Sequence, residues 1–237
     1  MYKGKSILCI IPARGGSKGL PGKNIKELNG QPLIAYTIEQ AQNSSYIDSL
    51  IISTDSKEIM IIADLYNCSY IQRSEQFATD ESPVSDTICE VINDLKYNHG
   101  TQFDIVLMLE CTSPLRRKDD IDNAIEMFID NYGTTDSLVA VGELTSDTEH
   151  PYCVKIEDDG YLQPFIKDSP AIYQRQQLDK AYSVFGGIYI VKVYQYIQRK
   201  TFYMERTIGF KVDRWQKFEI DDIVDFICVE ALMKKHE

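Results

Sequence analysis

Continuous apolar runs alternate with helical apolar stripes through the first 141 residues of the chain. Strands are predicted where apolar residues follow one another, at 7–11, 50–53, 103–109 and 137–141. Helices are predicted where apolar residues recur every three or four positions, at 32–41, 57–66, 85–97 and 118–128. This alternation predicts an α/β fold with a mainly parallel or mixed sheet covered on both faces. In such folds the ligand binds beyond the carboxyl ends of the strands.

The pattern changes after about residue 150. Two short extended pieces, 152–156 and 161–165, flank a turn signal at 158–160, and residues 171–180 are polar and rich in glutamine. We interpret residues 150–182 as a protruding arm that is a candidate for dimer contacts. An ordinary surface excursion is the alternative.

The pattern of the first half returns near the end of the chain. A strand is predicted at 187–191 and a last helix at 221–234. No linker, repeat or low-complexity stretch divides the sequence. We therefore expect one domain over residues 1–237, with the arm as its only appendage.

A loop rich in glycine and cations follows the first predicted strand, at residues 12–24. It contains four glycines, two prolines and the cations Arg14, Lys18 and Lys23. Glycine lets the backbone approach a ligand and present free N–H groups, while the cations add full positive charge. Such a loop at the carboxyl end of a strand predicts binding of a polyphosphate. The alternative is a tight turn without a ligand.

The loop matches neither of two common phosphate-binding motifs. A Walker A loop requires G-x-x-x-x-G-K-[ST], and here Gly19 is followed by Leu20. The dinucleotide motif G-x-G-x-x-G does not occur in the sequence. The sequence thus favours nucleotide chemistry that uses neither a P-loop nor a Rossmann site.

Composition narrows the class of protein. The 237 residues have a hydrophobic content of 43%, enough for a full core, and a net charge of −11 that argues against general nucleic-acid or membrane-surface binding. The six cysteines lack C-x-x-C spacing and the three histidines are dispersed, so we expect buried free thiols in a reducing compartment and no histidine metal site.

No signal peptide or apolar run of about 20 residues is visible, so a soluble, cytoplasmic protein is expected.

A carboxylate and two hydroxyls follow the predicted strand 103–109. Glu110 comes directly after the last apolar residue, and Thr112 and Ser113 lie in the turn that follows, with Arg116 beyond them. Glu110 is therefore placed to bind a substrate hydroxyl or amine, or to position a metal. The alternative is a carboxylate that only caps the turn.

Other strand ends carry polar groups with weaker signals. Asp55 follows the strand 50–53 and is expected to cap the next helix. Arg73, Thr79 and Asp80 lie in an irregular stretch that is able to close over a base. In the arm, Arg175 is followed by two glutamine amides, and its guanidinium matches a carboxylate in two parallel hydrogen bonds, although an exposed polar helix face is equally compatible.

Two carboxylates precede the last predicted helix. Glu219 and Asp221 are two positions apart, so in extended chain their side chains point to the same face. This arrangement suits Mg²⁺, which takes a few carboxylates together with phosphate oxygens. The alternative is helix capping, for which Asp221 or Asp222 is suited, and both functions can coexist.

Together these motifs resemble the acylneuraminate cytidylyltransferases, over nearly the whole chain. The loop at 11–24, IPARGGSKGLPGKN, is similar almost letter for letter to the nucleotide-binding signature of that family. Further motifs occur in the family's order: STD at 53–55, ATD at 78–80, TSPLR at 112–116, RQQL at 175–178 and GIYI at 187–190.

The resemblance implies a nucleotidyltransferase fold of the nucleotide-diphospho-sugar transferase type, dependence on Mg²⁺, and a homodimer whose arms reach into the neighbouring site. It also implies a reaction. The anomeric hydroxyl of a nine-carbon 2-keto sugar acid attacks the α-phosphate of CTP, which gives a CMP-sugar and pyrophosphate. The implied partners are CTP and the sugar acid, without nucleic acid or membrane.

The resemblance also implies roles for individual residues. Arg14, Lys23 and Asp221 would be catalytic, and Asp221 with Glu219 would hold the metal. The nucleotide would be bound by Ala13, Arg14, Gly15, Gly16, Ser17, Lys18, Asn24, Arg73, Thr79 and Asp80. The sugar acid would be bound by Glu110, Thr112, Ser113, Arg175, Gln176 and Tyr189.

The chain departs from the family's pattern at three places. Glu110-Cys111 stands where Gln-Pro is usual, which suggests a more cationic substituent on the sugar. Phe185-Gly186 stands where many members have Asn, and Glu219 replaces the first Asp of the usual metal pair. Sialic, legionaminic and pseudaminic acids remain open as substrates. The alternatives are another sugar or base, such as an eight-carbon keto acid, and a non-catalytic nucleotide-sugar binding protein.

Overall fold

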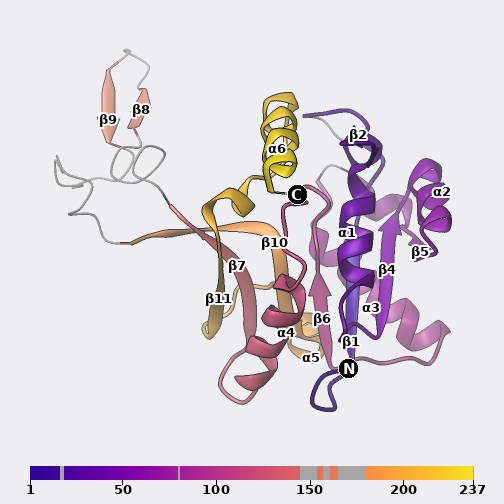
Figure 1. The fold of residues 1–237 in the computed structure, drawn as a ribbon. Coiled ribbons are helices and arrows are strands. Elements are labelled where there is room, and N and C mark those ends of the chain that lie inside the picture. The colour runs from indigo at the N-terminus through magenta and orange to yellow at the C-terminus, as the bar shows by residue number, and fades with distance from the viewer. Residues whose placement is uncertain (17–18, 80, 145–153, 157–160, 165–179, 237) are drawn as a thin grey trace.

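The computed structural model describes residues 1–16, 19–79, 81–144, 154–156, 161–164 and 180–236. Its centre is a seven-stranded sheet in the order β11-β7-β10-β6-β1-β4-β5 (Figure 1). The strands are β1 (Ile7–Pro12), β4 (Ser49–Thr54), β5 (Ser69–Gln72), β6 (Ile105–Met108), β7 (Ser137–Glu143), β10 (Tyr182–Lys192) and β11 (Thr207–Val212). The predicted α/β architecture and all of its predicted sheet strands are confirmed.

The sheet is mixed, because one strand runs against the others. β1 pairs in parallel with β4 and β6, β4 with β5, and β11 with β7. β10 is antiparallel to both of its neighbours, β6 and β7, and its register against β7 shifts between Val184 and Tyr189. This irregular stretch contains the two glycines Gly186 and Gly187, and bulges of this kind often re-aim groups beside an active site.

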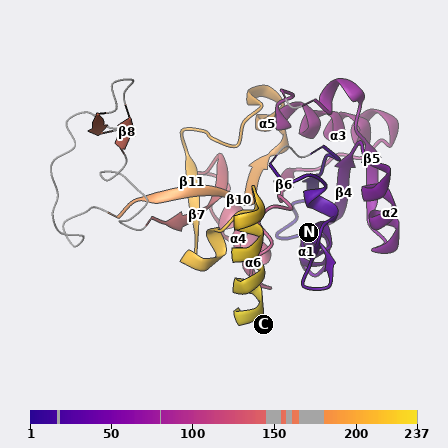
Figure 2. The same cartoon turned by 90° about the horizontal axis from the view of Figure 1, so that it is seen from above.

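Helices cover both faces of the sheet, as Figure 2 shows from above. The helices are α1 (Leu33–Gln42), α2 (Lys57–Leu65), α3 (Val84–Asn98), α4 (Asp120–Asp130), α5 (Val193–Arg199) and α6 (Ile223–His236). The five predicted helices are confirmed within two residues at each end. Short 3₁₀ turns occur at Lys23–Ile25, Glu75–Phe77 and Arg214–Lys217, and a small hairpin is formed by β2 (Glu27–Leu28) and β3 (Gln31–Pro32).

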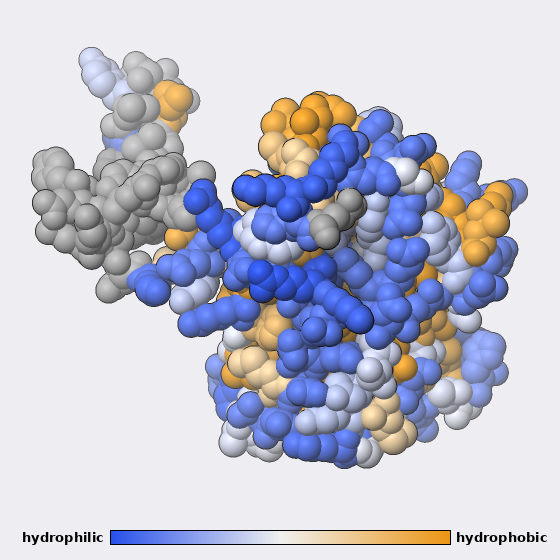
Figure 3. All heavy atoms as spheres, in the orientation of Figure 1, coloured by the Kyte–Doolittle hydropathy of each residue, from blue (hydrophilic) through white to orange (hydrophobic). Residues whose placement is uncertain are grey.

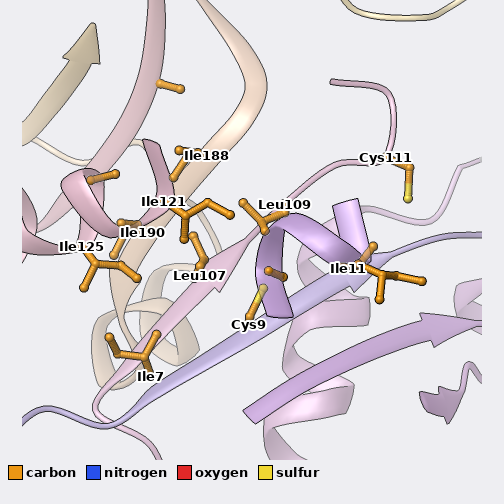
Figure 4. Packing of buried hydrophobic residues seen from close by; sticks show 14 of the residues in the cluster. Ile7, Cys9, Ile11, Leu107, Leu109, Cys111, Ile121, Ile125, Ile188 and Ile190 are labelled. Carbon is orange, nitrogen blue, oxygen red and sulfur yellow. The ribbon is translucent and has the colours of Figure 1, made fainter. Parts of the chain in front are cut away.

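The alternation of side chains along β1 divides the core into two layers. Ile7, Cys9 and Ile11 pack with α1, α2 and α4, whereas Leu8 and Ile10 pack with α3 and α5. Figure 4 shows the first layer, where side chains of β1 and β6 meet those of α4 and β10. Because β1 is buried on both faces, its sequence is a continuous apolar run.

The cysteine prediction is confirmed for four of the described residues and wrong for one. The thiols of Cys9, Cys68, Cys89 and Cys111 are free and buried, and burial raises the pKa of the Cys111 thiol to about 12. Cys228 is also free, but it is exposed on α6.

Helix α6 lies outside the two layers and closes the end of the sheet where β6 ends. Its Phe226 and Val229 pack with Leu115 and Ile220, and the Asp222 carboxylate accepts hydrogen bonds from the backbone N–H groups of Val224 and Asp225. The predicted capping role of Asp222 is therefore confirmed. The outer side of α6 is apolar as well (Figure 3), and its residues Ile223, Val224 and Ile227 are exposed.

The predicted extended pieces of the second half form a separate hairpin. β8 (Val154–Ile156) and β9 (Leu162–Pro164) pair in antiparallel fashion, and both ribbon views place them apart from the seven-stranded sheet (Figures 1 and 2). The predicted turn at 158–160 and most of the polar segment, 171–179, lie outside the described residues. Within the described part of the chain, no helix is both long and apolar enough to cross a bilayer.

An ion pair joins the amino ends of the parallel strands β7 and β11. The guanidinium of Arg206 donates to Asp136 at 2.6 and 3.0 Å, and the amide of Gln195 donates to the same carboxylate at 2.9 Å. These hydrogen bonds lower the pKa of Asp136 to about 2. The folded state therefore favours the charged carboxylate, which stabilises the protein above pH 4.

Replacing Asp136 by asparagine is expected to lower the free energy of unfolding by about 1–2 kcal/mol at pH 7. This value is smaller than the pKa shift alone implies, because Arg206 is half-exposed and solvent screens the ion pair. A lowered folded-state pKa contributes stability that is lost as the pH falls from about 4 to about 2. The difference in free energy of unfolding between the variant and the wild type should therefore become smaller as the pH falls through that range. Urea unfolding at several pH values measures it, with the exposed Asp130→Asn as control. An unchanged difference at pH 2 would contradict the assignment.

Candidate active site

The carboxyl ends of four neighbouring parallel strands meet at one edge of the sheet. The glycine-rich loop follows β1, Asp55 follows β4, Arg73 follows β5 and Glu110 follows β6. Since the spatial order of these strands is β6-β1-β4-β5, the loop lies between Glu110 on one side and Arg73 on the other. Residues from four separate parts of the sequence are thereby collected at one site.

The first of two cavities at this edge, the loop cavity, has a volume of about 490 Å³. It is lined by Arg14, Gly15, Gly16, Gly22, Asn24, Ile25, Asp55, Ser56, Lys57, Glu58 and Ile59. The backbone N–H of Gly15 donates to the Asp55 carboxylate at 2.9 Å. Gly15 also packs closely on Ser56, since a Cβ there would lie 2.9 Å from the Ser56 Cβ.

The predicted role of Asp55 as a helix cap is wrong. Ser56 is the N-cap of α2, and its hydroxyl accepts from the N–H of Ile59 at 3.3 Å. Asp55 instead fixes the glycine-rich loop through Gly15. Aspartate and serine are equally good N-caps, so two adjacent candidates gave the sequence no basis for choosing between them.

The second cavity, the strand-end cavity, has a volume of about 310 Å³. It is lined by Pro12, Arg14, Lys23, Asn24, Arg73, Thr79, Ser82, Val84, Thr87, Glu110, Cys111 and Thr112. Arg14 and Asn24 line both cavities, and the amide of Asn24 donates to the carbonyl of Arg14 at 3.1 Å. The two cavities are therefore neighbours that share the centre of the loop.

Lys23 joins the loop to the segment before α6. Gly22 has φ of +67°, a conformation that favours glycine, and the turn that it begins carries Lys23 into a largely buried position. The ammonium group donates to the carbonyl of Ile220 at 2.5 Å and to Asp221 at 3.2 Å. Gly19 permits the same approach, because a Cβ at Gly19 would collide with the carbonyl of Asp221.

Arg73 and Thr79 form the β5 side of the strand-end cavity. Arg73 is buried and donates to the carbonyl of Ser53 at 2.9 Å, and desolvation lowers the pKa of its guanidinium. The hydroxyl of Thr79 lies 2.7 Å from that of Ser82. These groups supply hydrogen-bond donors and acceptors of the kind that bind a ribose or a base.

Two carboxylates occupy the β6 side of the site. Glu219 accepts from the N–H of Gly186 at 2.5 Å and from the hydroxyl of Ser113 at 3.1 Å. Among the described residues, the Glu110 carboxylate accepts one hydrogen bond, from the Thr112 hydroxyl at 3.5 Å. Burial, followed by the nearby charge of Glu219, raises the pKa of Glu110 to about 7. Burial also raises the pKa of Glu219. Neither carboxylate forms an ion pair with a basic side chain in the described part of the chain, although Arg116 lies near Glu110 and Lys23 near Glu219.

Arg116 was predicted to line the site with its turn, but it lines neither cavity and instead braces the turn that carries Glu110. Its guanidinium donates to the carbonyl of Glu110 at 2.6 Å and to the carbonyl of Gly187 at 2.5 Å. It also reaches Gln40 and Thr37 of α1. The burial of Arg116 and its contacts with residues far away in the sequence could be seen only in the structure.

Two further predicted site residues are described but line neither cavity. Ala13 is buried and its N–H donates to the carbonyl of Ser53 at 2.9 Å. Tyr189 is buried against the rings of Phe202 and Tyr203 and lines neither cavity. The predicted residues that lie outside the described part of the chain are Ser17, Lys18, Asp80, Arg175 and Gln176.

Comparison with known proteins adds independent information. Residues 8–236 match the family model described as Cytidylyltransferase. The chain is 36% identical over 235 residues to the CMP-N,N'-diacetyllegionaminic acid synthase of Legionella pneumophila, covering 98% of this chain and 97% of the relative. It is 29% identical over 231 residues to the pseudaminic acid cytidylyltransferase of Campylobacter jejuni, covering 97% of each.

The fold has solved counterparts. A structure of CMP:2-keto-3-deoxy-manno-octonic acid synthetase complexed with CTP is similar with a TM-score of 0.71 at 18% identity, over 98% of this chain and all of that one. At this identity the likeness concerns the fold alone. The match of the family model along almost the entire sequence, together with the 36% identical relative, shows that this chain belongs to the cytidylyltransferase family.

Proposed function

We propose that the protein transfers CMP from CTP to the anomeric hydroxyl of a nine-carbon 2-keto sugar acid, giving a CMP-sugar and pyrophosphate. The observation that carries the proposal is the strand-end cavity, where Arg14, Lys23 and Arg73 stand across from Glu110. A triphosphate fits the cationic loop, and a sugar acid fits beside Glu110. The names of the relatives support a nine-carbon acid of the legionaminic, sialic or pseudaminic type.

The loop residues would stabilise the phosphates. Arg14 and Lys23 supply positive charge on either side of the loop. Because the glycines have no side chains, the backbone N–H groups of the loop can approach a phosphate oxygen. Lys18 and Ser17 belong to the same proposal by their place in the motif. Charge that is already in position stabilises the transition state without reorganisation, and it is the main catalytic contribution in phosphoryl-type transfer.

Asn24, Arg73 and Thr79 would bind the ribose and the base, together with Asp80. Arg73 is held by Ser53 of β4, and Asn24 is held by the Arg14 carbonyl, so both are fixed before the ligand arrives. Preorganised groups lose less freedom on binding, which favours affinity. On the opposite side Glu110, Thr112 and Ser113 would meet the sugar acid, with Arg175 and Gln176.

The residues present are compatible with a shared Mg²⁺ site. Asp221 is largely exposed beside Lys23, and Glu219 is fixed by Gly186 and Ser113. In the described part of the chain no three acidic, histidine or cysteine side chains form a complete metal cage. This suits Mg²⁺, which usually takes one or two carboxylates and completes its shell with water and substrate phosphates. When bound, Mg²⁺ would neutralise charge on the triphosphate.

We also propose a homodimer. The hairpin β8–β9 stands apart from the sheet, and the outer side of α6 presents the exposed apolar residues Ile223, Val224 and Ile227. Apolar surface of this kind commonly marks a protein interface. Sedimentation velocity over a range of protein concentrations distinguishes a dimer from a monomer.

Pyrophosphate release tests the function. The enzyme is incubated with CTP, Mg²⁺ and one of a panel of acids, namely N-acetylneuraminic, legionaminic, pseudaminic and eight-carbon keto acids, with UTP, GTP and ATP as controls. Release with CTP and a nine-carbon acid supports the proposal. Release with the eight-carbon acid alone would change the substrate class. Binding of CTP without release across the panel would indicate a non-catalytic binding protein.

Replacing Arg14 by alanine is expected to lower kcat/KM for CTP by about 100-fold, because a preorganised positive charge is lost from the phosphates. The measurement is pyrophosphate release at varied CTP concentrations. Arg199→Ala is the matched control, since Arg199 is exposed at the end of α5 and lines neither cavity. Near-normal turnover by the Arg14 variant would show that the phosphates are bound elsewhere.

A further inference from the structure

Glu110 and Glu219 pack against the same backbone atom, the Cα of Gly186. A Cβ built on Gly186 would collide with the Glu110 carboxyl and would lie 2.7 Å from an oxygen of Glu219. Gly186 lies in the irregular stretch of β10, and its carbonyl accepts from the N–H of Glu110 at 3.2 Å. The bulge therefore brings two carboxyl groups together at the end of β6.

Neither carboxylate has a cationic partner among the described residues. Two basic groups near them donate to other acceptors, because Arg116 donates to the Glu110 carbonyl and Lys23 donates to Ile220 and Asp221. Glu219 is partly compensated by the Gly186 N–H and the Ser113 hydroxyl. Glu110 has one long hydrogen bond, from Thr112 at 3.5 Å.

Two neighbouring, partly buried carboxylates are unfavourable when both are charged. A positive group placed beside Glu110 would offset the repulsion between the two carboxylates. The Glu110 carboxylate would in turn bind that positive group. Glu110 lines the strand-end cavity, whereas Glu219 does not, so a ligand in that cavity meets Glu110.

We propose that Glu110 is a specificity-determining residue that selects a sugar acid carrying a cationic nitrogen substituent, a protonated amine or an amidinium. The inference rests on the proposed function, and it names the substrate class of the same site. An amidinium presents two N–H donors in one plane, which matches a carboxylate in two parallel hydrogen bonds. A neutral amide in the same place would leave the Glu110 carboxylate without a cationic partner.

A metal ion is the competing source of positive charge. The shared Mg²⁺ proposed above would lie with Asp221 and Glu219, and neither of these lines the strand-end cavity. Asp221 is largely exposed on the Lys23 side, and Glu219 already accepts two hydrogen bonds from the protein. Glu110 is left as a separate subsite that faces the cavity.

The test compares two nine-carbon 2-keto acids that differ in one group, an acetamido in the first and an acetamidino in the second. These groups have nearly the same shape, but only the acetamidino group is cationic. A hydrogen bond that involves a charged group is worth about 1.5–3 kcal/mol, so the wild type should prefer the acetamidino acid by about 10-fold or more in kcat/KM. The Glu110→Gln variant should reduce this ratio to less than about threefold, mainly through KM for the cationic acid.

Glu205→Gln provides the same chemical change at an exposed position outside both cavities and should keep the wild-type ratio. Thermal unfolding establishes that the Glu110 variant is folded, and the wild-type ratio tests the proposal without any variant. A wild type that prefers the acetamido acid would overturn the inference. The same holds if Glu110→Gln keeps the ratio and instead raises the Mg²⁺ concentration required with both acids.

Different results would contradict the proposed cytidylyl transfer and the proposed role of Glu110. If the acetamido and acetamidino acids are both converted at equal rates, the cytidylyl transfer stands and only the role of Glu110 is overturned. If neither acid releases pyrophosphate while CTP still binds, the proposed function itself fails, and the inference fails with it.

Discussion

Lys23→Met is expected to lower kcat/KM for CTP by about 1000-fold, at the upper end of the effects measured for removal of one preorganised stabilising group. Methionine keeps most of the length of the side chain and its apolar stem while removing the charge. Lys23 differs from Arg14 in being largely buried, with 9% exposure, so its charge acts in a region of reduced screening. The measurement is pyrophosphate release with CTP varied at a saturating concentration of sugar acid.

The expected loss has two physical causes. The variant removes positive charge from the wall of the strand-end cavity, and it releases the Ile220 carbonyl and Asp221, which place the segment before α6. Lys118→Met is the control, since Lys118 is exposed and lines neither cavity. A small effect on turnover, with CTP binding unchanged, would show that Lys23 is only a structural link between the loop and Ile220.

The central part of the fold could be predicted because its elements are buried. β1, β4, β6 and β7 are rich in buried apolar residues, and the helices that cover them carry regular apolar stripes. The sequence did not reveal β5 or β11. Both are edge strands, and in both the side chains are mostly half-buried or exposed, so neither forms an apolar run.

The sequence pattern also could not predict that β10 runs antiparallel to its neighbours. Its apolar stretch at 187–191 predicted a strand, but the same stretch fits either direction. The extension back to Tyr182 passes through the irregular Phe185-Gly186-Gly187 stretch, where alternation is lost. This stretch is what places Gly186 against Glu110 and Glu219, so the least predictable part of the sheet supports the most distinctive part of the site.

Sequence reasoning found the loop and the strand ends of the site, because glycines, cations and carboxylates stand out where a strand ends. It did not find the contacts between them. The bond from Gly15 to Asp55 links residues 40 positions apart, and that from Lys23 to Ile220 links residues 197 positions apart. Nothing local in the chain signals such pairs, since they arise from the order of strands in the sheet.

Arg116→Met is expected to lower the free energy of unfolding by about 3–5 kcal/mol, because several buried polar groups would lose their partner at once. The guanidinium donates to two main-chain carbonyls, those of Glu110 and Gly187, and to the side chains of Thr37 and Gln40. Methionine fills similar volume but offers no donor. Each buried acceptor left unsatisfied costs about 1–3 kcal/mol.

The measurement is equilibrium unfolding in guanidinium chloride, with Arg117→Met as the matched control. Arg117 is the next residue, but it is half-exposed, and its partner Asp213 lies at the surface. An exposed ion pair contributes about 0–1 kcal/mol, so the control should unfold almost like the wild type.

The free energy of unfolding of Arg116→Lys should lie between those of Arg116→Met and Arg117→Met. One ammonium cannot span the four acceptors that the planar guanidinium reaches. If Arg116→Met were no worse than Arg117→Met, Arg116 would not brace this turn. The position of Glu110 in the cavity would then depend on Gly186 and the β6–β10 pairing alone.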